Sequence, residues 1–540
     1  MRRLLFLGAS LIANLALAAP PKLDAIFPAG GSRGSAVTVT LAGGGLDGKL
    51  DAWFDRPGLE VSQPPDSKEK LTVNIAADAA PGLYWLRVAN AEGVSARRPF
   101  YVSPLAEVLE VEPNDAPEKP QVVEPQTIVN GKLQKSGDVD GFRVRLKAGE
   151  TLIAHCDGHA ALGSPMDAAL QLCRLTERQA SVVDPPQVEA FVLQQNHDTV
   201  GLDPRIVFTA VQDGDYLVRL FAFPSEPDST INYTGRENFI YRLTLTTGPF
   251  VDFAFPPAVG RAGAEVELVG WNLPAELRRV QVPAATDALS FSPTLEAAGR
   301  ATVFYRESPV AIAEASQDVM PPAEFAGRLL QPNAEHAFNF TTKKGAKVKA
   351  AIESRSLGFP LDSLLQMRDD MGKTLLESDD AGKDRDSELT FAVPADGNYR
   401  LAVRDLYGRG GERLAYHLRI AAPEPDFRLT LADDTFATGA ERTAEITVTV
   451  DRRDGFAGEI EISAAELPAG VVAEPVLSAA KGDTAKTVKL KLKADAAENG
   501  RFVFRIAGVA KGEPALTRTA TFTTATPVTE AAGCLLFIRQ

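Results

Sequence analysis

The chain has 540 residues, of which 45% are hydrophobic, and a formal net charge of −14. This length predicts roughly three to five domains, and the hydrophobic fraction is ordinary for packed globular domains. The acidic balance argues against nucleic acid as the main partner, because phosphate binding requires a basic face. It fits a soluble protein that binds cations.

The first residues have the parts of a secretory signal peptide. Arg2 and Arg3 precede an apolar run over residues 4–17, and Ala16-Leu17-Ala18 has the A-x-A form of a cleavage site. No other apolar run approaches the ~20 residues that span a bilayer, so no membrane span is expected. We therefore predict a signal peptide over residues 1–18 and a mature protein that is secreted, periplasmic or at the cell surface.

Three cysteines are present, and export would permit a disulfide. Cys156 and Cys173 flank a predicted hairpin, and their spacing is compatible with a disulfide or with two small buried thiols. The short apolar segment 534–538 is interpreted as a last strand or a sticky end.

Residues 19–104 have the pattern of a small β-sandwich. Residues 36–41 and 70–75 alternate apolar and polar side chains, and turns rich in Gly or Pro separate the predicted strands. Four features follow one another here: a Phe-Pro pair at Phe27, a turn glycine at Gly34, an alternating strand over 37–41 and a Gly-Leu pair at Gly45. This series resembles immunoglobulin-like TIG/IPT domains, which implies a spacer or binding module.

Two clusters of oxygen-bearing side chains stand early in the next segment, residues 105–247. The first holds Glu110, Glu112, Asn114 and Asp115, and the second holds Asp138 and Asp140. In an extended chain alternate residues share a side, so Glu110, Glu112 and Asn114 are expected to face together. Calcium takes roughly 6–8 oxygen ligands, so the clusters predict a metal site. A solvated acidic linker is the alternative.

Four motifs in this segment occur in the order found in one bacterial family. They are Glu-x-Glu-Pro-Asn-Asp at 110–115, Gly-Asp-x-Asp-x-Phe at 137–142, Met-Asp-x-x-Leu at 166–170 and Asp-Gly-Asp-Tyr at 213–216. The series resembles the bacterial pre-peptidase C-terminal (PPC) domain, a jelly-roll-like β-sandwich found beside secreted proteases, including bacterial collagenases. In collagenase-type members, acidic residues of the N-terminal linker and the adjacent strand bind calcium. The resemblance therefore implies calcium at Glu110, Glu112, Asn114 and Asp115, with Asp138 and Asp140 as further ligands.

The same pattern recurs in the second half of the chain. Phe255-Pro256 opens a second TIG/Ig-like segment, residues 248–318, and Gly327 to Gly345 align without gaps on Gly131 to Gly149 in a second PPC-like domain, residues 319–421. In this copy Ala334 and His336 stand in place of the two aspartates, and no Glu-x-Glu-Pro-Asn-Asp precedes them. This favours a specific role for the oxygen clusters of the first copy, although sequence drift accounts for the loss equally well.

Residues 422–527 predict a further Ig-like sandwich, followed by a C-terminal tail at 528–540. A very regular strand over 487–492 places alternate lysines toward water. No segment has a long apolar stripe of period 3.6. The predicted fold is therefore all-β, with tandem immunoglobulin-like and jelly-roll-like sandwiches in an elongated row.

The search for catalytic residues finds no convincing set. Residues 30–34 match G-x-S-x-G, but a strand rather than a helix is expected after them, so a turn is predicted. No HExxH motif and no subtilase-like Asp, His and Ser blocks occur. His155, Asp157 and His159 would share one side of a strand as zinc ligands, but a strand end is the preferred interpretation. The acidic run 377–386 is interpreted as a solvated loop or a weak cation site.

The sequence thus predicts a secreted, non-catalytic multidomain protein at the cell surface or matrix. It would bind other components there or act as a spacer between them, with a calcium-stiffened joint between domains. An accessory subunit of an extracellular peptidase system is the first alternative, and a structural component of an extracellular layer is the second. The expected partner is an extracellular protein or polysaccharide.

Overall fold

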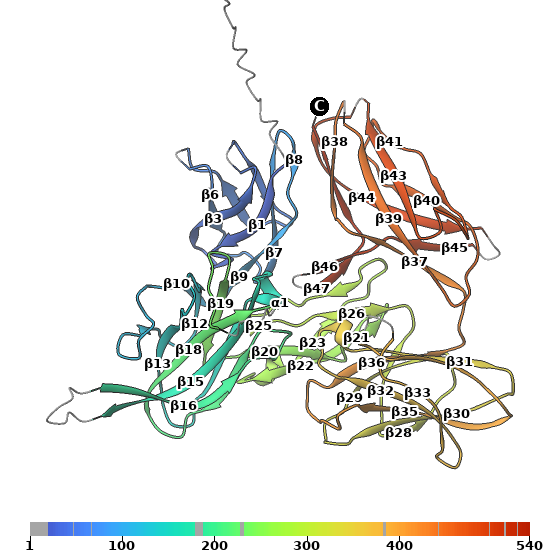
Figure 1. Ribbon diagram of the computed structural model, residues 1–540, viewed down its shortest axis with the longest axis horizontal. Coiled ribbons are helices and arrows are strands. Elements are labelled where there is room, and N and C mark those ends of the chain that lie inside the picture. The colour runs from blue at the N-terminus through green and yellow to red at the C-terminus, as the bar shows by residue number, and fades with distance from the viewer. Residues whose placement is uncertain are drawn as a thin grey trace, which may run out of the picture.

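The computed structural model describes residues 20–539 apart from 47, 66, 179–186, 227–231, 382–384, 441, 496, 512–514 and 526–527. The predicted signal peptide lies outside the described residues. In the described part, strands grouped into facing sheets make up almost all regular structure, and the α-helix α1 (His159–Leu162) has only 4 residues (Figure 1). The predicted all-β class of tandem sandwiches is confirmed. None of the described helices is long and apolar enough to cross a membrane.

The first small sandwich precedes residue 105 and has two sheets. One has the order β1 (Lys22–Phe27), β3 (Ala36–Gly44), β6 (Lys70–Ile75) and β5 (Leu59–Ser62). The other has the order β2 (Gly30–Ser32), β9 (Arg98–Ser103), β7 (Gly82–Asn90) and β4 (Asp51–Phe54), with β8 (Gly93–Val94) beside β7. Successive side chains of a strand point to opposite faces of the sheet, so the apolar residues Leu71, Val73 and Ile75 of β6 all face the space between the two sheets and are buried in the core.

The first PPC-like module is a sandwich of two five-stranded sheets. The first sheet runs β10 (Ala106–Leu109), β12 (Thr127–Lys132), β19 (Ile240–Thr246), β14 (Thr151–Asp157) and β17 (Arg205–Thr209). The second runs β11 (Gln121–Val122), β13 (Asp140–Leu146), β18 (Gly214–Pro224), β15 (Met166–Arg178) and β16 (Gln187–Asn196).

A second small sandwich follows. Its sheets are β23 (Arg279–Val282), β22 (Ala264–Trp271), β20 (Phe250–Phe255) and β25 (Ala298–Gly299), and β21 (Ala258–Gly260), β26 (Val303–Arg306) and β24 (Ser290–Phe291).

The second PPC-like module repeats the strand order of the first. One sheet runs β27 (Val310–Ile312), β29 (Ala323–Arg328), β36 (Ala415–Ala421), β31 (Lys347–Glu353) and β34 (Glu388–Ala392). The other runs β28 (Ser316–Asp318), β30 (Glu335–Thr342), β35 (Gly397–Asp405), β32 (Ser363–Asp369) and β33 (Thr374–Ser378). The internal repeat inferred from sequence is therefore a repeat of topology.

The C-terminal sandwich begins with β37 (Asp426–Leu431). One sheet adds β39 (Ala444–Arg453), β43 (Thr487–Ala494) and β41 (Val471–Ala473); the other runs β38 (Thr435–Thr438), β48 (Cys534–Ile538), β44 (Gly500–Ala510), β40 (Ile460–Ala465) and β42 (Val476–Ser478). The short strands β45 (Leu516–Thr519), β46 (Phe522–Ala525) and β47 (Val528–Ala531) complete it. Because β48 lies between β38 and β44, the sandwich continues beyond the expected boundary at 527. Segment 534–538 is a last strand and not a sticky end.

The row of sandwiches is bent, which the expectation of an elongated row did not foresee. The C-terminal sandwich lies beside the first small sandwich (Figure 1), where Asp434 pairs with Arg87 at 2.6 Å and with Arg97 at 3.1 Å. Trp53 stacks on Phe537 with 6.3 Å between ring centroids. Strand patterns carry no information about angles between domains, so these contacts could not be read from the sequence.

All three cysteines are free and buried. Cys156 lies on β14 and Cys173 on β15, which belong to different sheets of the first PPC-like module. Burial raises the pKa of both thiols. The disulfide alternative is therefore not formed, and the cysteines serve as small buried side chains.

Candidate metal centre

The chain crosses between the two sheets of the first PPC-like module through residues 110–120, which link β10 to β11. Strand β11 runs parallel to β13, with Gln121 opposite Phe142. Parallel neighbours begin at the same edge of a sheet, so the crossing loop lies over the start of β13. The approach is close, because a Cβ on Gly141 would stand 2.8 Å from the carbonyl oxygen of Asn114.

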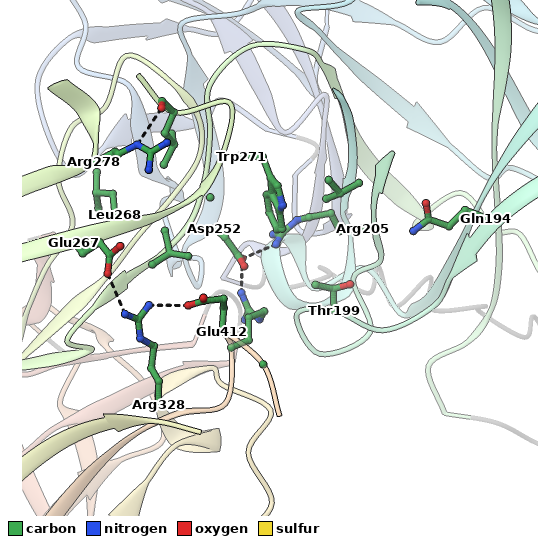
Figure 2. Close-up of a pocket in the computed structure, with 16 residues that line it drawn as sticks. Gln194, Thr199, Arg205, Asp252, Glu267, Leu268, Trp271, Arg278, Arg328 and Glu412 are labelled. Carbon is green, nitrogen blue, oxygen red and sulfur yellow. Dashed lines mark hydrogen bonds and ion pairs between the residues drawn. The ribbon is translucent and has the colours of Figure 1, made fainter. Parts of the chain in front are cut away.

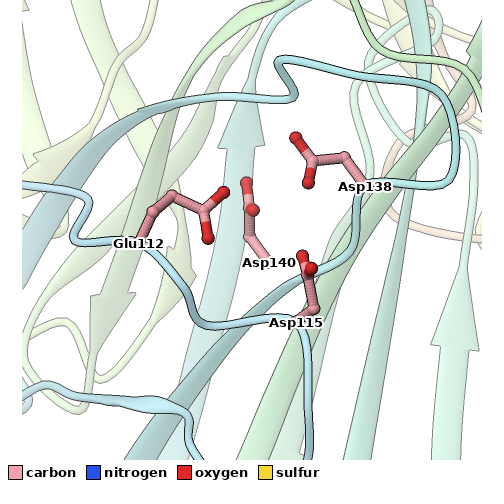
Figure 3. Close-up of side chains that lie close together, drawn as sticks. All are labelled: Glu112, Asp115, Asp138 and Asp140. Atoms are coloured by element: carbon pink, nitrogen blue, oxygen red, sulfur yellow. The ribbon is translucent and has the colours of Figure 1, made fainter.

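This crossing brings four acidic side chains together, as Figure 3 shows. Glu112 and Asp115 come from the loop, and Asp138 and Asp140 come from the entry to β13. One carboxylate oxygen from each lies within 4.8 Å of the others. We call these four residues the carboxylate cluster.

Several oxygens at the carboxylate cluster lack a hydrogen bond although they are buried. Asp138 and Asp140 are 0% exposed, and the Oδ1 atom of each has no hydrogen-bond partner. The same holds for Oδ1 of Asp115 and of Asn114. Buried polar atoms are rarely left unpaired, so these oxygens remain available to a ligand.

The other oxygens of the carboxylate cluster are held in place by the chain. Asp138 Oδ2 accepts a hydrogen bond from the backbone nitrogen of Gln134 at 2.5 Å. Asp140 Oδ2 accepts one from the Tyr241 hydroxyl at 2.6 Å, and Glu112 Oε2 accepts one from the Asn114 nitrogen at 3.0 Å. With one oxygen anchored and the other free, the carboxylates are preorganised to face a common point.

Burial and mutual repulsion disfavour negative charge here. Burial, followed by repulsion from Glu110, raises the pKa of Asp140 to about 9. Burial is also the main cause that raises the pKa of Glu110 to about 7. Protons therefore neutralise part of the site when no cation is bound, and a divalent cation would replace them.

One lysine contacts the carboxylate cluster from the solvent side. Lys135 Nζ lies 3.4 Å from Asp115 Oδ2 and 3.5 Å from Asp138 Oδ1. Its side chain is 62% exposed, and attraction to Asp138 is the main cause that raises its pKa. A single exposed ammonium group balances only part of four carboxylates.

The donor set fits a hard cation. Among the described residues the group contains carboxylates and no His or Cys, which matches calcium or magnesium rather than zinc. Calcium accepts 6–8 oxygens in irregular geometry. One carboxylate oxygen from each of the four residues converges, and carboxylates that bind through both oxygens, together with water, would bring the ligand number toward that range. The residues present therefore fit calcium.

The structure places the six predicted ligands in two roles. Glu112, Asp115, Asp138 and Asp140 converge, and Asn114 is buried next to Glu112 in the same loop. Glu110 does not join the converging group; its Oε2 accepts hydrogen bonds from the Lys132 nitrogen at 2.7 Å and the Tyr241 hydroxyl at 3.2 Å.

The expected alternation of Glu110, Glu112 and Asn114 was wrong, because residues 110–120 form a loop and not a strand. Sequence reasoning also missed Tyr241 and Lys135. A signal for Tyr241 was present, since Gly131 faces it across β12 and β19 and a Cβ at Gly131 would stand 2.2 Å from its ring.

The alternative zinc site at His155, Asp157 and His159 is not formed in the described part of the chain. His155 Nε2 lies 3.2 Å from Asp157 Oδ1, while Asp157 also pairs with Arg300 at 2.8 Å. His159 begins α1. His155 and Asp157 therefore belong to a buried polar contact that reaches Arg300 of the second small sandwich.

The acidic run 377–386 forms no cation site among the residues that the structure describes. Asp386 instead accepts hydrogen bonds from the backbone nitrogens of Arg355 and Ser356 at 2.8 and 3.0 Å.

Known proteins resemble parts of this chain. A family model for the bacterial pre-peptidase C-terminal domain matches residues 334–405. A protein of Deinococcus radiodurans described as a probable subtilase-type serine protease is 43% identical over 74 residues, which are 14% of this chain and 10% of that protein. The chain thus spans about a tenth of this curated relative.

Solved structures give weaker matches. The pre-peptidase C-terminal domain of a Bacillus anthracis collagenase is 15% identical, with a TM-score of 0.16. The match covers 19% of this chain and 93% of the collagenase domain. A Bacteroides ovatus mixed-linkage glucan utilisation protein, SGBP-B, is 10% identical with a TM-score of 0.15 over 75% of this chain and 76% of that one. Scores this low carry no argument about function. The family match does establish that this chain contains a bacterial pre-peptidase C-terminal domain.

Proposed function

We propose that this chain is a non-catalytic multidomain protein that acts outside the cytoplasm, where it binds or spaces other components, and that its first PPC-like module holds a calcium ion. The observation that carries the calcium proposal is the carboxylate cluster, whose four side chains converge within 4.8 Å while buried oxygens of Asp138 and Asp140 lack partners.

The proposed ion would fix the joint at the entrance of the module. It would tie the loop 110–120 to the start of β13, and that loop continues from β10, which directly follows the first small sandwich. A neighbouring contact supports this view, because the Glu107 nitrogen of β10 donates to Ser32 Oγ of the small sandwich at 2.8 Å. Ser32, from the G-x-S-x-G match, thus has a structural hydrogen bond.

The PPC domain and the match to a subtilase-type protease fit a peptidase-associated, extracellular context. An accessory subunit of an extracellular peptidase system is therefore the second candidate. The partner in either case would be an extracellular protein or polysaccharide. A structural role in an extracellular layer has no observation that favours it specifically.

Thermal melting with a calcium titration tests the site. Binding to the native state alone stabilises it by about 2.7 kcal/mol at one hundred times the Kd, so the melting temperature of the first module should rise. Asp115→Ala should abolish this rise. Glu118→Ala is the matched control, because it removes a carboxylate from the same loop without touching the carboxylate cluster.

The wild-type chain would contradict the calcium proposal if its melting temperature did not change at millimolar calcium. A protease assay with the same protein tests the non-catalytic part. Clear peptidase activity that one point mutation abolishes would overturn it.

A further inference from the structure

A cavity of about 620 Å³ lies where the first PPC-like module, the second small sandwich and the second PPC-like module meet (Figure 2). Arg205 of β17 lines it from the first module, Asp252 and Trp271 from the small sandwich, and Arg413 from the loop before β36. A cavity of this size accommodates a small ligand or the end of a peptide.

The cavity has more cationic than anionic side chains. Four arginines line it, namely Arg205, Arg278, Arg328 and Arg413, against the three carboxylates Asp252, Glu267 and Glu412. Arg328 is paired with both glutamates, at 3.1 Å to Glu267 and 2.8 Å to Glu412. Asp252 is shared, because Arg205 and Arg413 both contact its Oδ1 atom (Figure 2).

Three guanidinium groups at the cavity are incompletely paired. The Arg205 side chain is only 4% exposed, and its Nε has no hydrogen-bond partner; the same is true of Arg413 Nε. Arg278 has no carboxylate within ion-pair distance among the described residues, and its Nε donates to the Leu273 carbonyl oxygen at 3.3 Å. In a chain of net charge −14, this local excess of guanidinium groups favours a carboxylate ligand.

A free sheet edge leads to the cavity. In the described sheet, β16 pairs with β15 alone, so one side of its backbone has no strand partner. Three consecutive apolar residues on it are exposed: Phe191 by 61%, Val192 by 42% and Leu193 by 37%. Protein edges are normally protected by charges, proline or shortness. Strand β33, at the same place in the second module, has only 5 residues.

The edge and the cavity are continuous, because Gln194 of β16 also lines the cavity. We propose that β16 binds an extended peptide as an added strand and that the C-terminal carboxylate of this peptide enters the cavity. The peptide runs parallel to β16, so that its last residue passes Gln194. Its backbone pairs with the free edge, its apolar side chains cover Phe191 and Leu193, and its carboxylate accepts hydrogen bonds from the arginines. The inference does not depend on calcium in the first module.

Fluorescence anisotropy with the full chain tests this. The probe is a fluorescein-labelled octapeptide of alternating valine and threonine that ends in a free carboxylate, and the comparison probe is the same peptide with an amidated C-terminus. We expect the free acid to bind about tenfold more tightly. Arg278→Ala should reduce that preference to less than twofold. Arg279→Ala is the matched control, because Arg279 is exposed, pairs with Glu265 and does not line the cavity.

A second variant tests the edge. Phe191→Lys replaces an exposed side chain, so folding should be unaffected, and it should weaken both peptides about equally. Equal affinity for the two peptides, or an Arg278→Ala variant that behaves like Arg279→Ala, would overturn the proposal, as would the absence of binding by the wild-type chain. Displacement of the peptide by oligogalacturonate at lower concentration than by unlabelled peptide would identify an acidic polysaccharide site instead.

Discussion

The two PPC-like modules have the same strand order but differ at the edge where the carboxylate cluster lies. Asp140 of the first accepts a hydrogen bond from Tyr241; at the same position of the second, His336 Nδ1 is 2.7 Å from the hydroxyl of Tyr416. The crossing loop shrinks from residues 110–120 to residues 313–315. The tyrosine and its sheet therefore belong to the fold, whereas the fold forms without the four carboxylates.

The modules differ in a second buried centre as well. In the first, Arg242 on β19 lies opposite Asp157 on β14; in the second, His417 on β36 lies opposite Glu353 on β31. Each of these basic side chains also contacts a second carboxylate: Arg242 contacts Glu107, and His417 contacts Glu324. One module thus has a permanent cation at this place and the other has a titratable one, so the two should respond differently to pH.

The largest expected effect comes from removing the carboxylate opposite the permanent cation. Asp157→Ala should cost about 3–5 kcal/mol, because it leaves the buried guanidinium of Arg242 and its neighbour Arg300 short of a partner. Glu353→Ala should cost about 1 kcal/mol, since this side chain is 40% exposed. Scanning calorimetry of both variants measures the difference. Equal losses would mean that the two centres are energetically alike.

The next effect concerns the histidine of the second module. Burial alone would lower the pKa of His417, but its hydrogen bonds to Glu324 and Glu353 raise it overall. A raised folded-state pKa gives stability that is present below about pH 6.5 and is lost as pH rises through the raised value. His417→Gln should therefore destabilise the second module by about 1.5–3 kcal/mol at pH 6 and by less at pH 9.

Urea unfolding at the two pH values measures this. His336→Gln is the matched control: burial lowers the pKa of His336. This shift disfavours the folded state as pH falls below about 6.5, so the loss of His336 should not cost more at pH 6 than at pH 9. A His417→Gln penalty that is the same at pH 6 and pH 9 would contradict the prediction.

The calcium affinity of the first module should increase with pH, whereas the stability that His417 gives the second module decreases with pH. The folded-state pKa values of Asp140 and Glu110 are raised to about 9 and about 7. Without calcium these acids favour folding at low pH, and that stability is lost as pH rises from about 4 to 9. Calcium needs the deprotonated form of Asp140, so its affinity should increase up to about a hundredfold from pH 6 to pH 8, with release of about one proton. Calorimetric titration in two buffers of different ionisation enthalpy measures both quantities.

Sequence reasoning succeeded where the information is local. The alternating residues 70–75 and 487–492 form β6 and most of β43, because alternation directly sets which side chains a strand buries. The residue types of the carboxylate cluster were also identified. Their arrangement was not, because Asp115 reaches the cluster through a loop and Tyr241 reaches it through pairing with a strand far away in sequence.

The contact of Asp434 with Arg87 had no local signal either. Contacts between domains depend on the angles at every joint, and a joint is specified by scattered side chains such as Asp157 and Arg300 whose partners lie in different domains.

The smallest effect distinguishes the modules at a single exposed position. Lys135 lies beside Asp115 and Asp138, and the corresponding residue of the second module is Gln331. The ammonium group competes with a metal ion for the same oxygens, although solvent screens it. Lys135→Gln should therefore tighten calcium binding by about two- to fivefold, measured by calorimetric titration at low ionic strength. Lys147→Gln, in the same module away from the carboxylate cluster, should change the affinity less. Weaker calcium binding in Lys135→Gln would show that the lysine orders the carboxylates rather than competing for them.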